Sequence, residues 1–364
     1  VHGSRGLGDV YKRQLLTDDV SIDNMSGKDW SEKIISELKT MPNVTLKNRS
    51  QVFGYYDHNM MVMFERVGDH LSNKSKYTPR QRLWYIRAKE TILSTGSIER
   101  PIVFGNNDTP GVVLSSAAKE YMKVYGVLVG RKPIIFTNND SAYETAFEFK
   151  KNNVEPIILD TREEHDSEVV QEAKNKGIQI KFSYGVIVAN GYKKVKSAKI
   201  GKLTKDKKSF ESTETINCDC ICVSGFWTPT VHLASQSGNK LKFDEKIDAF
   251  IPDKSKQNEK TIGAANGSFT LQETIESGFK TGSELSSKIT DKNNENKIPT
   301  VTETKYSVHD KFWCMPLPKN ENPKRFVDFQ NDVAVSDIEI ALREGYRSIA
   351  VSYTHLRAHE THEH

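Results

Sequence analysis

The chain has 364 residues, 36% of them hydrophobic, and is long enough for two domains with apolar cores. Its 52 lysines and arginines barely exceed its 48 aspartates and glutamates, and this excess is spread along the chain, which argues against a nucleic-acid-binding protein. No apolar run has membrane-spanning length, so no membrane partner is expected. Four cysteines in such a chain indicate a reducing, cytoplasmic setting rather than a disulfide framework.

Both ends of the chain resemble translated sequencing adapter. Residues 4–14 can be back-translated to a DNA whose reverse complement encodes residues 351–359, and unrelated protein segments almost never mirror each other in this way. We therefore expect residues 1–14 and 350–364 to be adapter, and we exclude them as processing scars are excluded. The native part is expected to run from about Leu15 to Ile349 and to be cut at both ends.

The first predicted elements are a helix and several strands. Helical spacing of apolar residues predicts a helix over 29–38, capped by Asp29 or Ser31. Apolar runs then predict strands that begin at Val44, cover Ser50 to Tyr56, and form an antiparallel pair over 60–67 and 83–93.

Three turns of small residues follow apolar strands. Thr95-Gly96 ends the strand at Leu93, Ser224-Gly225 ends a strand from Cys218, and a third turn at Gly263 precedes a helix. Glycine lets backbone approach a dinucleotide, although a Thr-Gly pair alone also suits an ordinary strand-ending turn. We expect a helix from near Ser115, and we expect the strand from Cys218 to return the chain to the first domain.

The clearest unit is a strand–helix–strand pattern. Strands over 133–136 and 156–160 flank a helix over 141–151, which predicts a parallel sheet. The turn between the first strand and the helix has no glycine, which disfavours close approach of a pyrophosphate. Asp160 nevertheless stands where a ribose-binding acid belongs. A nucleotide fold kept as scaffold is the preferred interpretation, with a dinucleotide site as the alternative.

The cysteines do not predict a metal site. Cys218, Cys220 and Cys222 alternate along one strand, so they share a face but are too spread to converge on one tetrahedral zinc. We expect them to be buried, apolar-like residues.

Six motifs together resemble one family, the α subunit of heterotetrameric sarcosine oxidase. The resemblance runs in order along Leu15 to Ile349 and rests on residues 53–59, 95–101, 136–143, 223–229, 232–238 and 326–332. It implies an α/β fold of the two-dinucleotide-binding-domain type, like pyridine nucleotide-disulfide oxidoreductases. It also implies truncation, with a glycine-rich motif missing before Leu15 and a folate-binding domain missing after Ile349.

On this resemblance the chain divides into two interleaved domains. The expected parts are an NAD-binding domain over 15–125, an inserted second nucleotide fold over 126–212, a return to the first domain over 213–290, and a linker with a cysteine-free ferredoxin-like remnant over 291–349.

The resemblance also implies an activity that is shared among subunits. The family oxidises sarcosine to glycine and releases H2O2 with formaldehyde or 5,10-methylenetetrahydrofolate. It implies NAD in this chain, FMN at the interface with the β subunit, FAD and zinc in other subunits, and tetrahydrofolate in the missing C-terminal domain. The implied partners are the β, γ and δ subunits, in the cytoplasm. No catalytic residue and no metal ligand are expected in this fragment, and it is not expected to be active alone, so we treat it as a binding subunit.

The site residues follow from the matching motifs. Val52 is expected to meet the adenine through its backbone, and Thr95 and Gly96 to lie near the pyrophosphate or nicotinamide. The other side of the NAD site is expected to be closed by the turn at Gly263 with Ala264, Phe269 and Leu271.

Two other functions stay open. Related α subunits of dye-linked amino-acid and opine dehydrogenases carry a cysteine-rich iron–sulfur module in the region matching 327–349, which has no thiol here. A stand-alone NAD(P)H-dependent reductase would need a redox disulfide, for which Cys218, Cys220 and Cys222 are poorly arranged.

Overall fold

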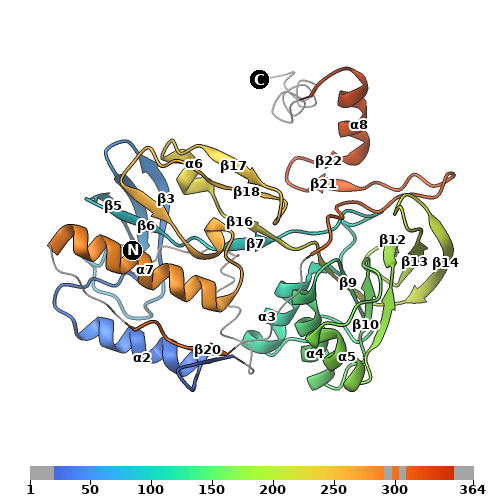
Figure 1. The fold of residues 1–364 in the computed structure, drawn as a ribbon, viewed down its shortest axis with the longest axis horizontal. Helices are drawn as coiled ribbons and strands as arrows, with labels where there is room; N and C mark the ends of the chain where they lie inside the picture. The colour runs from blue at the N-terminus through green and yellow to red at the C-terminus, as the bar shows by residue number, and fades with distance from the viewer. Residues whose placement is uncertain (1–19, 291–296, 303–308, 348–364) are drawn as a thin grey trace. The chain divides into compact units, whose positions relative to one another are not determined.

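The computed structural model describes residues 20–290, 297–302 and 309–347, which fall into two compact units (Figure 1). Unit 1 comprises residues 1–99 and 227–305, and unit 2 comprises residues 100–226 and 306–364. The boundaries differ from the expected changes of domain at 125/126 and 212/213. The physical reason is that β8 (Val112–Leu114) and β15 (Cys220–Ser224) are parallel neighbours in the sheet of unit 2.

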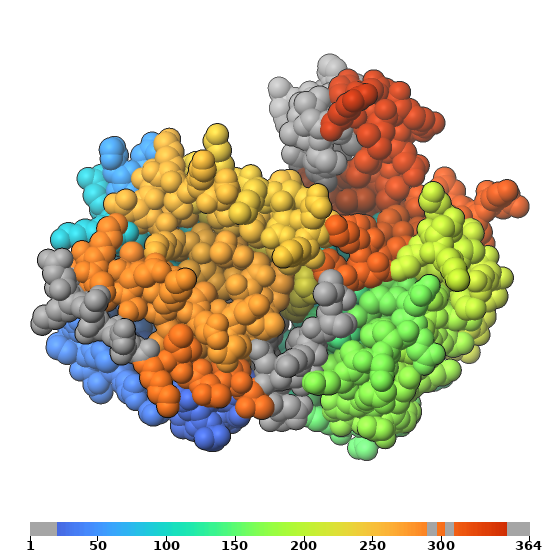
Figure 2. Space-filling view, viewed as in Figure 1, coloured from blue at the N-terminus to red at the C-terminus, as the bar shows by residue number. Residues whose placement is uncertain are grey.

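Unit 1 combines short sheets with two longer helices. Its elements are β1 (Ser21–Ile22), β2 (Met25–Ser26), α2 (Gly27–Thr40), β3 (Ser50–Tyr56), β4 (Met60–Arg66), β5 (Gln81–Arg87), β6 (Thr91–Leu93), β7 (Ser97–Glu99), β16 (Trp227–Pro229), α6 (His232–Gln236), β17 (Leu241–Asp244), β18 (Ala249–Pro252), β19 (Glu259–Thr261), η2 (Gly263–Asn266), α7 (Leu271–Thr290) and β20 (Val301–Thr302). In the space-filling view, α7 and the β17–β18 hairpin form much of the visible surface of this unit (Figure 2).

The first helix begins earlier than its apolar spacing predicted. Ser26 is the N-cap of α2, and its Oγ accepts a hydrogen bond of 3.1 Å from the backbone N–H of Asp29, so the expected caps Asp29 and Ser31 lie inside the helix. Its apolar face packs Trp30 against Leu271 and Ile275 of α7. This packing fixes one end of α7.

The antiparallel sheet is confirmed, with one correction. Strands β3, β4 and β5 form a three-stranded sheet in that order. The predicted strand over 83–93 is two strands, because the chain leaves the sheet at residues 88–90 and β6 pairs in parallel with β19 instead. The strand expected at Val44 does not form, and residues 44–47 have no regular structure.

Unit 2 is built around a parallel sheet of order β11-β10-β9-β15-β8. Its elements are β8, α3 (Ser115–Tyr125), β9 (Pro133–Thr137), η1 (Asp140–Ala142), α4 (Tyr143–Lys151), β10 (Ile157–Asp160), α5 (Glu168–Asn175), β11 (Gln179–Phe182), β12 (Tyr184–Asn190), β13 (Ser197–Leu203), β14 (Phe210–Asn217), β15, β21 (Phe326–Asp328), β22 (Val333–Ala334) and α8 (Val335–Arg343). The predicted strand–helix–strand unit β9–α4–β10 and the helix starting at Ser115 are confirmed.

Two apolar cores lie on the two faces of that parallel sheet. Ile135 and Ile158 pack with residues of α3, α4 and α5 on one face, whereas Ile134 and Phe136 pack against the antiparallel sheet β12-β13-β14 on the other. Because both faces are covered, the strands are continuous apolar runs rather than alternating ones. The prediction that the strand from Cys218 returns the chain to the first domain is wrong, since β15 lies between β9 and β8.

The segment expected as a linker and remnant over 291–349 is divided between the units. Strand β20 pairs with β1 in unit 1, whereas Cys314 bridges to Val103 in unit 2. The hairpin β21–β22 and α8 follow in the same unit. The expected adapter segments and the start of the native part at Leu15 lie outside the described residues. Among the described helices, none is long and apolar enough to cross a membrane.

Candidate functional site

Two strand ends in unit 1 bring the predicted turns together. Strands β6 and β19 run in parallel with Leu93 opposite Thr261, and the N–H of Ile262 donates to the carbonyl of Leu93 at 2.9 Å. The chain after each strand therefore emerges at the same edge. Ligands of open α/β sheets bind outside the carboxyl ends of strands, so this edge is the candidate nucleotide site of unit 1.

The glycines of both turns adopt left-handed backbone angles. Gly96 has φ 75° and Gly263 has φ 63°, a region that costs residues with a Cβ roughly 1–2 kcal/mol. A Cβ on Gly263 would also lie 3.2 Å from Cγ2 of Thr274. The two turns thus need glycine for their shape, which fits a cradle of backbone around a nucleotide.

Thr95 is held by a neighbour that the sequence did not reveal. Its Oγ1 donates to the carbonyl of Thr230 at 2.7 Å, and the N–H of Thr230 donates to the carbonyl of Gly96 at 2.9 Å. Thr230 follows β16, which pairs with β7, so this contact fixes the turn from its far side. Because the Thr95 proton is used, a ligand would meet the backbone of this turn or the remaining lone pair of the hydroxyl.

The remaining predicted residues divide into those near the edge and those in the core. Val52 is buried on β3, in the same apolar cluster as Leu93 of β6. Ala264 is buried in η2, directly after Gly263. Leu271, by contrast, has its side chain fully buried in the cluster that contains Ile22 and Trp30, so that side chain cannot contact a ligand. Phe269 is half-buried before α7.

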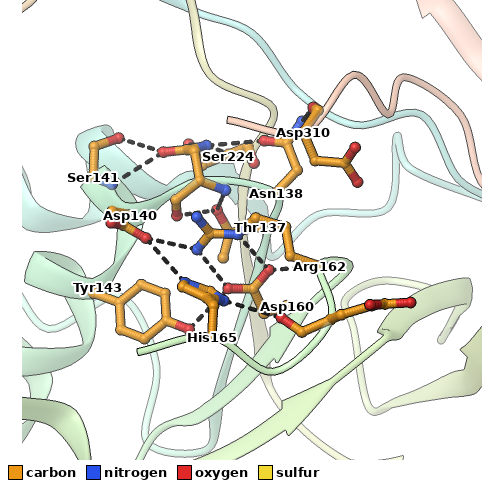
Figure 3. Close-up of polar contacts among 12 residues, drawn as sticks. Thr137, Asn138, Asp140, Ser141, Tyr143, Asp160, Arg162, His165, Ser224 and Asp310 are labelled. Carbon is orange, nitrogen blue, oxygen red and sulfur yellow. Dashed lines mark hydrogen bonds and ion pairs between the residues drawn. The ribbon is translucent and has the colours of Figure 1, made fainter. Parts of the chain in front are cut away.

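Unit 2 has a buried polar cluster at the corresponding edge of its own sheet (Figure 3). Asp160, at the end of β10, is fully buried and accepts two hydrogen bonds from the guanidinium of Arg162, at 2.9 and 2.7 Å. The hydroxyl of Tyr143 donates to the same carboxylate at 2.8 Å. Arg162 also pairs with Asp140 at 2.7 Å, and Nε2 of His165 lies 3.5 Å from that Asp140 oxygen.

Within this cluster, one guanidinium pairs with two carboxylates. Burial alone would lower the pKa of Arg162, but its hydrogen bonds to Asp160 and the charges of Asp160 and Asp140 raise it above its usual range. Burial, with the Asp160 carboxylate beside it, raises the pKa of Tyr143. A ribose-binding acid must be free to accept from ribose hydroxyls. Asp160 is instead engaged by Arg162 and Tyr143, which sequence spacing alone did not show.

The glycine-free loop after β9 is also occupied by the protein itself. Asn139 donates to Oγ of Ser224 at 3.1 Å and accepts from the N–H of Ser141 at 3.1 Å. Asn138 donates to the carbonyl of Asp310 at 2.7 Å, and the N–H of Asp310 donates back to Asn138 at 3.0 Å. The segment from His309 therefore lies over the loop where a pyrophosphate would have to bind. This arrangement supports the scaffold interpretation of unit 2.

The cysteines have no feature of a reactive or metal-binding site. Sγ of Cys220 lies 3.6 Å from Sγ of Cys222, and both side chains are fully buried. Burial raises the pKa of Cys218 to about 12, so its reactive thiolate form is disfavoured. Within the described part of the chain, none of the four cysteines forms a disulfide and no group of metal-ligating residues is present.

The fold defines a class of proteins. The structure is similar to L-proline dehydrogenase from P. horikoshii, with TM-score 0.60 and 17% identity over 94% of this chain and 62% of that one. It is also similar to thioredoxin reductase from T. acidophilum, with TM-score 0.52 and 15% identity over 73% of this chain and 81% of that one. The chain therefore has the α/β fold of FAD- and NAD-dependent oxidoreductases.

Sequence comparison identifies the relatives within that class. The chain is 31% identical over 352 residues to sarcosine oxidase subunit alpha of Rhizobium meliloti (strain 1021), covering 95% of this chain and 34% of that one. The subunit alpha of Corynebacterium sp. (strain P-1) is 30% identical over 336 residues, 90% of this chain and 34% of the relative. The resemblance drawn from the motifs is confirmed: the chain is homologous to sarcosine oxidase subunit alpha, an oxidoreductase subunit, along nearly all its length.

A family model matches the C-terminal part separately. The sarcosine oxidase A3 domain matches residues 322–355, which include β21, β22 and α8. The match runs beyond Ile349 into the stretch expected as adapter, so that boundary stays a prediction. The chain spans about a third of the length of the curated relatives it matches, 34% in each case.

Proposed function

We propose that this chain is part of the α subunit of a heterotetrameric sarcosine oxidase, in which it binds NAD and forms one wall of an FMN interface. The observation that carries this proposal is the homology to sarcosine oxidase subunit alpha over 90–95% of the chain. The full complex would demethylate sarcosine to glycine, with H2O2 and formaldehyde or 5,10-methylenetetrahydrofolate as products. Its other members would be β, γ and δ subunits, in the cytoplasm.

The edge formed by β6 and β19 supports the NAD assignment. Two glycine turns with left-handed backbone angles follow the paired strands there, and Val52 lies in the same apolar cluster as Leu93 of β6. In this proposal the flavins supply the redox chemistry elsewhere in the complex. The residues of this chain bind and orient a nucleotide.

The NAD site is tested by alanine substitution of its two glycines. A Cβ at Gly96 or Gly263 strains the turn by roughly 1–2 kcal/mol unless the backbone relaxes. If NAD requires the unrelaxed turn, its binding weakens by about 5- to 30-fold in Gly96→Ala and Gly263→Ala. The measurement is NAD released from the purified complex by acid and quantified enzymatically.

A matched control is available in the neighbouring helix. Gly278→Ala in α7 adds the same methyl group where nothing lies within 4 Å, so it should leave the NAD content unchanged. The assignment fails if the complex releases FAD from this subunit instead of NAD. It also fails if sarcosine reduces the bound NAD, since NAD is proposed as a resident ligand outside the electron path.

The α subunit of a dye-linked amino-acid or opine dehydrogenase is the second candidate, favoured by the structural likeness to L-proline dehydrogenase. Such subunits are expected to hold an iron–sulfur cluster in the region matching 327–349, and this region has no cysteine. We therefore expect the purified complex to produce H2O2 from sarcosine and oxygen without added dye. Turnover that requires an artificial electron acceptor, together with bound iron, would favour the dehydrogenase.

A further inference from the structure

The antiparallel sheet of unit 1 has apolar side chains on both faces. On the inward face, Val52, Met63 and Trp84 pack into the apolar cluster that also contains Leu93. On the opposite face, Phe64 stands across from Leu83 and Val62 across from Tyr85. An antiparallel sheet with one solvated face normally carries polar residues there. The outward face of this sheet departs from that pattern.

We define the meander face as the outward surface formed by Tyr56, Val62, Phe64, Leu83 and Tyr85. These residues belong to β3, β4 and β5, and Figure 1 labels β3 and β5. Three of its side chains are open, with 42% of Tyr56, 47% of Leu83 and 69% of Tyr85 exposed, whereas Phe64 is half-buried and Val62 is buried. The ring of Tyr56 lies over Gly54, where a Cβ would come within 2.6 Å of it. Contiguous exposed apolar surface of this kind marks interaction sites.

An exposed arginine stands at each end of the meander face. Arg87 lies opposite Met60 at one end, and Arg66 lies opposite Gln81 at the other. Met60 and Arg66 are six residue steps apart along β4, which corresponds to roughly 20 Å at the rise of a β-strand. Among the described residues, neither arginine forms an ion pair.

On the inward face of the same sheet, by contrast, charged side chains form ion pairs. Glu65 is the only acid in β3, β4 and β5, and it points inward. There it lies 3.4 Å from Lys47 and 3.6 Å from Arg82, and it accepts a hydrogen bond from Trp84. The meander face therefore carries positive charge at both ends and no acid to balance it.

We infer that the meander face binds another subunit of the oxidase, through a surface with an apolar centre and a carboxylate on each side to meet Arg66 and Arg87. The inference rests on the proposed function, and the relatives are named as one subunit of an assembly. Aromatic residues and arginine are enriched in protein interfaces, and arginine pairs carboxylates bidentately. The charge of the face selects an acidic partner, and its apolar centre supplies the buried area.

The inference is tested with the full-length α subunit and its purified partner subunits. Tyr85→Asp places a charge at the centre of the meander face, and Arg66→Glu with Arg87→Glu reverses its ends. Each change should raise the Kd between α and the bound subunit at least about tenfold. The arginine pair should also abolish the salt dependence of that Kd. The matched control is Tyr77→Asp, in the loop before β5, where 88% of the tyrosine is exposed.

Two outcomes overturn the inference while leaving the proposed function intact. The first is a Tyr85→Asp complex as tight as the Tyr77→Asp complex. The second is a photo-crosslinker at Leu83 that reacts only within the α chain, since the remainder of that chain would then cover the face. Failure of the wild-type chain to bind any subunit would overturn both proposals. Crosslinks from Leu83 to a separate polypeptide support the inference.

Discussion

Single residues in unit 2 show how neighbours decide what a side chain does. Asp160 has the position of a ribose-binding acid, yet Arg162 and Tyr143 use its carboxylate within the protein. Arg162 lies only two residues beyond Asp160, and a basic residue this close to an acid was the sequence signal that the carboxylate could be paired within the protein. Spacing could not show that the guanidinium folds back onto Asp160, because this depends on the buried Asp140, which begins η1 after the neighbouring strand β9.

Removing Arg162 should destabilise the chain more than removing an exposed cation. Arg162→Met leaves two buried carboxylates without their partner, which we expect to cost about 3–5 kcal/mol in the free energy of unfolding. The control is Lys150→Met, whose partner Glu155 is 72% exposed and whose loss should cost less than about 1 kcal/mol. Urea unfolding measures both. Equal effects of the two substitutions would contradict the role given to Arg162.

Glu259 gives the stability of unit 1 a dependence on pH. Burial raises the pKa of this carboxyl, despite hydrogen bonds from Ser237, Asn239 and Thr261. The Ser237 hydroxyl has one proton and two acceptors in reach, the carbonyl of Ala234 at 2.7 Å and Oε2 of Glu259 at 2.8 Å. A protonated Glu259 resolves this conflict by donating to Ser237.

The sign of the effect follows from the raised pKa. The stabilisation by protonated Glu259 is complete below the ordinary glutamate pKa, about 4.3, and is lost as pH rises through the raised folded value. Glu259→Gln keeps a neutral side chain, so its Tm should rise relative to wild type across that window. Thermal melts from pH 4 to 8 measure the difference, with Glu37→Gln on the exposed surface of α2 as control. A constant difference across the range would contradict the argument.

At the scale of elements, the local sequence pattern predicted those strands and turns whose formation depends on residues close in the sequence. The runs at 133–136 and 156–160 predicted β9 and β10, since a strand buried on both faces must be apolar throughout. The two glycine turns of the candidate site were also predicted, because small residues after apolar strands are a local signal. Leu271 could have been assigned to the core, since Leu271, Ile275 and Phe279 recur every four residues along the buried side of α7.

The local sequence pattern could not predict which distant strands pair with each other. The run from Leu83 to Leu93 has no break in its apolar character strong enough to reveal that β6 leaves the sheet for β19. Nor did the strand from Cys218 show which domain it joins, because an apolar strand with a Ser-Gly turn suits both. Its place between β9 and β8 is decided by contacts with residues about 90 and about 110 positions away in the sequence. Thr230, which holds the Thr95 turn, went unnoticed for the same reason.

At the scale of the whole molecule, most of unit 2 lies, in sequence order, between the two parts of unit 1. Residues 100–226 contribute the whole parallel sheet of unit 2, and residues 20–99 need 227–302 to complete the pairing of β6 with β19. The C-terminal segment then adds Cys314, Asp310 and the β21–β22 hairpin to unit 2. This order along the chain explains why the expected domain boundaries, which were placed at the ends of single motifs, differ from the observed boundaries of the two units.

The separation of β6 from β19 sets an order of events on the ribosome. Synthesis proceeds at roughly 5–20 residues per second, so β19 emerges on the order of ten to thirty seconds after β6. The parallel sheet of unit 2 is complete by Ser224, before β19 exists. The inserted unit can therefore fold while the two glycine turns are still apart. The candidate edge of β6 and β19 therefore forms after that sheet, and under the proposed function a nascent chain would retain NAD only after Gly263 has joined Gly96.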